Sequence, residues 1–106
     1  MIVLKKDRGK IAEIKNITRK EINIMKVDGY DFVPCFDNIY AFVSYKETFE
    51  DENFNCQLRT PLGGKVFCFG DFYIVKKGIF GVKNLKKEEI EKILSLILEE
   101  KPEHWW

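Results

Sequence analysis

Short runs of apolar and β-branched residues, many of them alternating with polar ones, fill most of the chain and predict β-strands. These runs cover residues 2–5, 11–14, 30–37, 39–45, 54–60 and 65–76. The last run is the most apolar, and because Gly70-Asp71 interrupts it we expect two strands or one bulged strand there. Residues 79–82 add a short edge piece, and Pro34 predicts that its own strand lies at an edge of the sheet or bends there.

A short helix is predicted over residues 19–27 by two local signals. Thr18 and Glu21 have the spacing of a capping box, and Ile17 and Ile22 have that of a hydrophobic staple. The apolar side of this helix is assigned to Ile22, Met25 and Val27.

A second, amphipathic helix is predicted over residues 87–100, before Pro102. Its apolar face comprises Ile90, Ile93, Leu94, Ile97 and Leu98. Together these elements predict an α+β fold, with a mainly antiparallel sheet of five to seven short strands and two helices. We expect one domain over residues 1–106, in which residues 103–106 form a short C-terminal tail.

Composition points to a protein of the cytoplasm. The chain has 106 residues, of which 45% are hydrophobic and 33% charged, and no apolar run approaches the length of a membrane span. Cys35, Cys56 and Cys68 are odd in number and form no Cys-x-x-Cys pair, so we expect reduced thiols, no metal site and no cofactor. A membrane partner is not expected either.

The net charge of +1 is the sum of four segments whose charges alternate in sign. Residues 1–27 and 59–87 are mainly basic, whereas residues 28–58 and 88–106 are mainly acidic. The segments either form a polarised surface or cancel where strands adjoin, and we favour cancellation. Because there is no dominant basic balance, nucleic acid is not expected as a partner.

Catalytic groups are scarce. His104 is the only histidine, so a cysteine nucleophile has one potential base, and it lies in the tail. The acidic run at residues 47–53 lacks the spacing of a calcium loop. We therefore predict that the chain is not an enzyme and has no catalytic residues.

Arg59 is the first candidate for binding, because it is the sole basic residue between Lys46 and Lys65. Its guanidinium either reaches outward to solvent or anchors a carboxylate or phosphate. With Gln57 on the same strand, Lys65 nearby and an aromatic ring for stacking, it would suit an anionic nucleotide.

The middle and end of the chain, about residues 27–98, resemble a family of small domains of unknown function from firmicutes, their phages and mobile elements. The similar segments are Gly29-Tyr30-Asp31-Phe32, Phe36-Asp37-Asn38, Gln57-Leu58-Arg59 and Gly70-Asp71-Phe72-Tyr73-Ile74-Val75, followed by the final helix. Gln57-Leu58-Arg59 stands where that family has an Asn-Arg pair. The resemblance adds Tyr30 and Asp31 to the candidate binding residues and implies a phage-type accessory protein in the bacterial host cytosol.

Three functional hypotheses follow. The first is a non-enzymatic phage or mobile-element protein that binds and inhibits a host protein, such as a CRISPR effector or another defence component. The second is a small-ligand binding protein that sequesters an anionic nucleotide signal. The third is a small enzyme of unknown activity.

Trp105 and Trp106 generate the first testable prediction. Two indoles either pack on the core or anchor an interface, and we expect an interface, in a homodimer, because exposed indoles on a monomer favour aggregation. Replacing both with Ala should leave stability nearly unchanged and weaken self-association by about 2 kcal/mol or more, measured by sedimentation. A monomeric wild type with a mutant less stable by about 2–5 kcal/mol would show that the indoles pack on the core.

Overall fold

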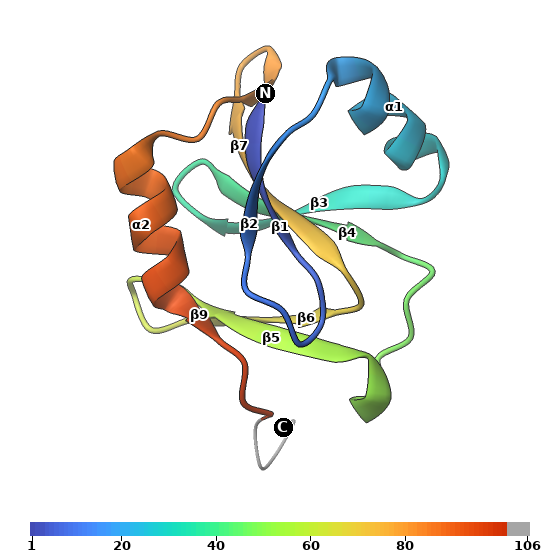
Figure 1. Ribbon diagram of the computed structural model, residues 1–106, viewed down its shortest axis with the longest axis vertical. Coiled ribbons are helices and arrows are strands. Elements are labelled where there is room, and N and C mark those ends of the chain that lie inside the picture. Colours follow the sequence, from blue (N-terminus) through green and yellow to red (C-terminus); the bar gives the residue numbers. More distant parts are fainter. Residues whose placement is uncertain (102–106) are drawn as a thin grey trace.

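The computed structural model describes residues 1–101 as two antiparallel sheets and two helices (Figure 1). The larger sheet comprises β1 (Ile2–Lys6), β2 (Glu13–Asn16), β3 (Tyr30–Phe36), β4 (Ile39–Ser44), β7 (Phe72–Gly78) and β8 (Gly81–Lys83). The smaller comprises β5 (Phe54–Arg59), β6 (Lys65–Phe69) and β9 (Ile97–Leu98). The helical elements are α1 (Arg19–Val27), α2 (Lys87–Leu96) and a 3₁₀ turn, η1 (Asp51–Asn53).

The α+β prediction is confirmed in outline, but the strands are divided between two sheets. The larger sheet has the order β2-β1-β7-β4-β3, with β8 paired to β7 alone, and the smaller has the order β6-β5-β9. Residues 1–101 form nine strands, more than the five to seven predicted. Residues 65–76 fall in two strands, β6 and β7, which is one of the two predicted alternatives, and these strands belong to different sheets. Strand β9 was not predicted. No helix among these residues is long and apolar enough to cross a membrane.

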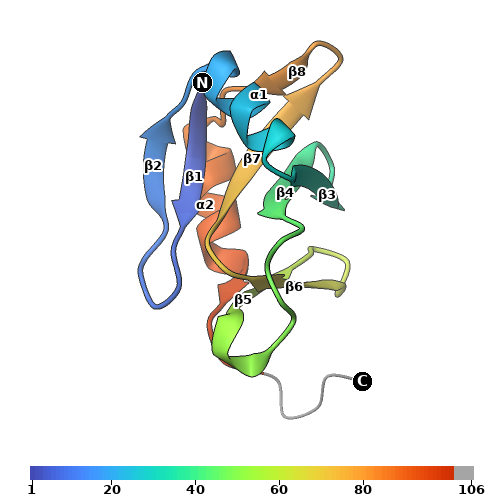
Figure 2. The same ribbon diagram turned by 90° about the vertical axis from the view of Figure 1, so that its right-hand side faces the viewer.

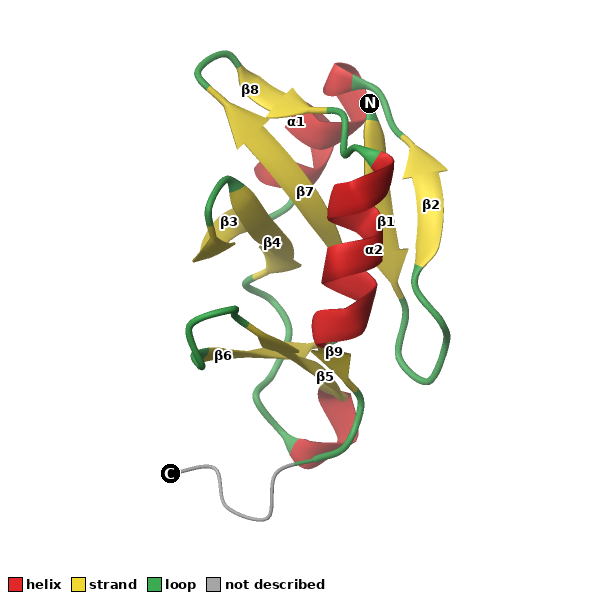
Figure 3. Cartoon of the chain, turned by 90° about the vertical axis from the view of Figure 1, so that its left-hand side faces the viewer, coloured by secondary structure: helices red, strands yellow, loops and turns green. Residues whose placement is uncertain are grey.

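Strand β7 lies at the centre of the larger sheet and is buried on both faces. Phe72 and Ile74 face one apolar cluster, whereas Val75 faces another. The first cluster packs against α2 and the smaller sheet, and the second against α1. The two helices accordingly lie on opposite faces of the larger sheet, as Figures 2 and 3 show. This double burial explains why residues 72–75 of β7 form a continuous apolar run.

Helix α1 begins and ends at the predicted residues. The Thr18 hydroxyl accepts a hydrogen bond from the Glu21 amide at 3.1 Å, and Ile17 and Ile22 are both buried in the second cluster. Val27 was wrongly assigned to the apolar side, since its side chain is 88% exposed. Val27 is the last residue of the helix, from which the chain turns into β3, and its side chain lines an open groove on the side of α1 away from Ile22.

Helix α2 ends at Leu96 and not near residue 100 as predicted. Ile97 has extended backbone angles, and Ile97 and Leu98 form β9, paired with Leu58 and Gln57 of β5. The hydrophobic spacing suits a helix through Leu98, but pairing with β5 satisfies backbone groups that would otherwise be unpaired at the sheet edge. Leu94, also predicted on the apolar face, is substantially exposed.

Strand β2 is shifted relative to the prediction for residues 11–14. The chain turns after Asp7, whose carbonyl accepts the Lys10 amide at 3.2 Å, and Gly9 adopts a positive φ of 71°. Strand β2 then pairs only with β1, at the sheet edge. Ile11 and Ile14 remain exposed because nothing in the described chain covers this edge.

A buried lysine joins the two sheets. Lys6, at the end of β1, is 1% exposed, and its ammonium contacts Asn55 Oδ1 at 2.9 Å, the Asp7 carbonyl at 3.0 Å and Glu99 Oε1 at 2.8 Å. The Asn55 amide donates in turn to the carbonyls of Lys6 and Gly70, at 2.9 and 2.8 Å. Each of the three ammonium hydrogens therefore has an acceptor. Through its own hydrogen bonds, Asn55 links β5 to both β1 and the turn before β7.

Asn55→Ala tests this junction. The change leaves the Lys6 ammonium and two carbonyls without their buried partner, so we expect a loss of about 3 kcal/mol in the free energy of unfolding. Urea titration followed by circular dichroism measures it. Asn23→Ala, at an exposed site on α1, is the matched control and should change stability by less than about 0.5 kcal/mol. Equal stabilities of the two variants would show that the junction contributes nothing.

Glu89 ties the start of α2 to β7. Its carboxylate contacts Lys76 Nζ at 2.9 Å and accepts the Lys86 amide at 2.8 Å. Partial burial acts to raise the pKa of Glu89, but the hydrogen bonds from Lys76 and Lys86 outweigh it, so the pKa lies below its ordinary value of 4.5. Its ionised form therefore stabilises the fold.

Glu89→Gln should destabilise the protein at pH 7 by about 0.5–1 kcal/mol, since Gln keeps the cap but loses the charge. Because the folded pKa is depressed, the difference from wild type should be complete above the ordinary pKa and disappear as the pH falls through the folded value. Thermal unfolding between pH 3 and pH 7 measures it. Glu91→Gln removes an exposed carboxylate from the same helix as control. A gap for Glu89→Gln that persists at low pH would contradict this account.

Candidate functional site

The candidate residues from the sequence lie in two separate places. Gln57 and Arg59 are on β5 and Lys65 is on β6, in the smaller sheet. Tyr30 and Asp31 are on β3, at the far edge of the larger sheet (Figure 1). The structure therefore does not bring all five together into one binding site.

Arg59 and Lys65 do lie side by side. They are Cα partners at the turn end of the β5–β6 hairpin, and both are exposed. The turn that joins their strands is fixed by Thr60, whose hydroxyl accepts the Gly64 amide at 2.9 Å. Neither cation forms a salt bridge within the part of the chain that the structure describes. Two like charges directly opposite one another repel, so an anion between them would be stabilised.

The side chain of Gln57 has a structural role. Its side chain is buried, and its Nε2 donates to the carbonyl of Glu100 at 3.0 Å. Its Oε1 has no hydrogen-bond partner among residues 1–101. Gln57 therefore holds the segment after β9 against β5 instead of presenting its amide to a ligand beside Arg59.

Tyr30 and Asp31 support the end of the β3–β4 pair. The Tyr30 ring packs on Phe42, with centroids 5.3 Å apart, and burial raises the pKa of its hydroxyl. Asp31 accepts hydrogen bonds from the Phe32 amide at 2.7 Å and the Tyr45 hydroxyl at 3.2 Å. The Asp31 charge raises the pKa of Tyr45. Both candidates thus have partners within their own sheet.

The three cysteines are free thiols in or near the core. Cys56 and Cys68 are Cα partners and fully buried, and burial raises the pKa of Cys35 to about 11. A hydrogen bond from Cys68 lowers the pKa of Cys56 against the effect of burial, and the Lys6 ammonium lowers it further. A substrate has no access to this sulfur in the folded protein. Residues 1–101 contain no group of three side chains suited to a metal ion.

The C-terminal predictions fall outside the described residues. Trp105 and Trp106, the proposed interface anchors, lie there with His104. The homodimer therefore stays a prediction.

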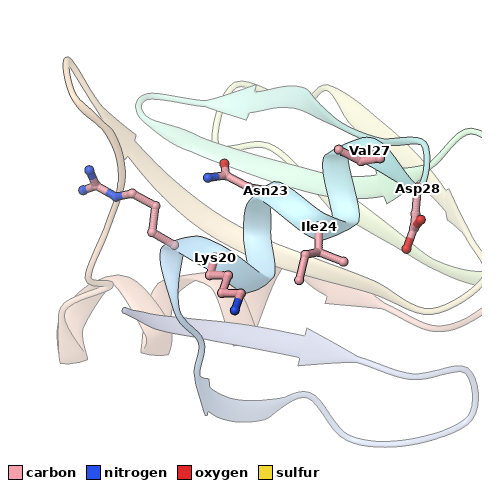
Figure 4. A pocket seen from close by; sticks show the side chains of 6 residues that line it. Lys20, Asn23, Ile24, Val27 and Asp28 are labelled. Carbon is pink, nitrogen blue, oxygen red and sulfur yellow. The ribbon is translucent and has the colours of Figure 1, made fainter.

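A surface on α1 is not among the sites predicted from the sequence. We use "outer face of α1" for the side that lines an open groove of about 530 Å³ (Figure 4). It comprises Arg19, Lys20, Asn23, Ile24, Val27 and Asp28. Ile24 is 52% exposed and Val27 is 88% exposed, so two branched apolar side chains face solvent one helical turn apart.

The signal for this surface was present in the sequence. Ile24 and Val27 have an i, i+3 spacing, which places them on one side of a helix, while Ile22 and Met25 have the same spacing on the side that faces the sheet. Helix α1 therefore carries two apolar stripes, and only one of them is needed to pack it.

Comparison of the chain with models of known protein families, with curated proteins and with solved structures found no match. The resemblance to small domains from firmicutes and their phages is therefore neither supported nor contradicted, and it stays a prediction.

Proposed function

We propose that this chain is a non-enzymatic phage or mobile-element accessory protein that acts in the bacterial cytosol by binding a host protein and inhibiting it. A bacterial defence component is the target class that the resemblance suggests. The observation that carries the proposal is the outer face of α1, an exposed apolar stripe on a short helix at the surface of the fold.

The apolar part of this face is where binding would release free energy. Ile24 and Val27 remain largely in water in the isolated chain. Fully burying a branched side chain of this size stabilises a complex by about 1.5–3 kcal/mol relative to exposure. Nine residues make a helix about 13 Å long, which is enough to place one turn of anchors in an apolar groove of a partner protein.

The charges on this face are arranged against the helix dipole. Arg19 and Lys20 stand in the first turn, where carboxylates are favoured, and Asp28 caps the C-terminus, where cations are favoured. The favourable charges, Glu21 and Lys26, are not among the residues that line the groove. An unfavourable arrangement confined to one face suits a surface whose charges serve recognition. We infer a partner groove with carboxylates opposite Arg19 and Lys20.

Ile24→Gln/Val27→Gln is the variant that tests the proposal. Glutamine has a higher helix propensity than Ile or Val, so the helix is kept, but it removes the apolar anchors, and binding of the partner should weaken at least about 30-fold. Leu62→Gln/Ile79→Gln, at two turn sites that are almost fully exposed, is the matched control. Wild type and both variants, crosslinked in lysates of firmicute hosts, identify a partner that depends on this face.

The purified partner then allows a quantitative measurement. Its affinity for the three proteins is determined by calorimetry, and its own activity is assayed with and without the wild-type chain. We expect inhibition by wild type and by the control, and none by Ile24→Gln/Val27→Gln at the same concentration. A partner that binds both variants equally would overturn the assignment to α1, and a partner whose activity is unchanged by binding would overturn the inhibitory role.

A further inference from the structure

Two lysines converge on one aromatic ring where α1 packs on the larger sheet. We call this group the lysine–aromatic cluster; it comprises Lys26 of α1, Phe32 of β3, Tyr40 of β4 and Lys77 of β7. Lys77 Nζ lies 4.2 Å from the centre of the Phe32 ring and 5.1 Å from that of Tyr40, and Lys26 Nζ lies 5.7 Å from Phe32. Four elements thus supply one compact group.

Contacts with two neighbouring aromatic rings hold Phe32 in place. Phe32 stacks on buried Phe42 with centroids 4.6 Å apart and an interplanar angle of 27°. Tyr40 meets Phe32 edge to face, at 6.3 Å and 83°. The stacked pair fixes one face of the Phe32 ring, so the ammonium groups gather on its remaining surface. The two cations are therefore positioned by a helix and a strand and not by loops.

Neither ammonium has a carboxylate partner within residues 1–101. The four salt bridges described there involve Lys5, Lys6, Lys15 and Lys76. The nearest acidic side chain in sequence to Phe32 is Asp31, which accepts hydrogen bonds from Tyr45 and the backbone instead. Contact with an aromatic ring attracts a cation but does not neutralise it. Two cations that share a ring without a counter-charge form a ready site for an oxyanion.

A small cavity adjoins the cluster. It has a volume of about 130 Å³, lies between α1 and the β7–β8 hairpin, and is lined by Arg19, Lys26, Phe80 and Val82 among others, with no carboxylate. Val82 is the Cα partner of Lys77, which places the cavity next to both lysines. Phe80 is 90% exposed, so its ring is available for stacking. A cavity of roughly this size accepts a single six-membered ring.

We propose that the lysine–aromatic cluster and the cavity that adjoins it bind a pyrimidine nucleotide. The phosphates lie between Lys26 and Lys77, with Arg19 reaching the same anion, and the base enters the cavity against Phe80. Phosphate recognition by cations together with base stacking on an aromatic ring is the usual chemistry of nucleotide binding. The site differs from the Arg59–Lys65 pair expected from the sequence, which lies in the other sheet.

Calorimetric titration with UDP, uridine and inorganic pyrophosphate tests the proposal. UDP should bind with a dissociation constant in the micromolar range, and both fragments should bind at least about tenfold more weakly, because each loses one half of the contacts. Phe80→Ala should weaken UDP about tenfold and leave pyrophosphate unchanged. Absence of UDP binding at millimolar concentration, or pyrophosphate binding as tight as that of UDP, would overturn the proposal.

Charge-matched variants locate the site. Lys26→Gln/Lys77→Gln should weaken UDP at least about 30-fold, whereas Arg59→Gln/Lys65→Gln removes the same charge and should bind UDP like wild type. The reverse result would place the nucleotide at the β5–β6 hairpin and refute this assignment. Ile24→Gln/Val27→Gln should also bind UDP like wild type. Loss of partner binding and loss of nucleotide binding are therefore distinguished, because each is expected in a different variant.

Discussion

The buried ammonium of Lys6 is the interaction on which the arrangement of the two sheets depends. A cation taken out of water loses several kcal/mol of hydration unless every donor is matched. Its acceptors come from β5, from the turn after β1 and from the segment after β9. These three segments lie next to one another only when the smaller sheet packs against the larger one. The ammonium is thus satisfied in one arrangement of the fold, and a displaced sheet would leave it buried and unpaired.

The elements that the sequence predicted well are those whose signals are local. The cap at Thr18 and the staple of Ile17 and Ile22 lie within a few residues of the helix that they define, and α1 has the predicted bounds. The end of α2 was wrong because the backbone partner of Ile97 is Leu58, which no periodicity in residues 87–100 can reveal. Burial of Lys6 was equally hidden, since a lysine before Asp7 and Gly9 is typical of an exposed turn.

The candidate site shows the same division. Arg59 and Lys65 could be expected to be neighbours because a single tight turn joins their strands. Tyr30 and Asp31 could not be placed relative to them, since strand order between sheets is decided by long-range pairing. The lysine–aromatic cluster draws on four elements from Lys26 to Lys77, and its members share no spacing that a motif could describe.

Strand order also has a consequence for synthesis. Strand β1 leaves the ribosome well before β7, its central partner, with Leu4 opposite Ile74. Until β7 has emerged, Val3 and Leu4 can pair only within the β1–β2 hairpin and have no core to enter. Domains dominated by such distant contacts fold slowly and expose apolar strands meanwhile. The nascent chain therefore carries an unfinished sheet until β7 has emerged, and chaperones have access to β1 during that interval.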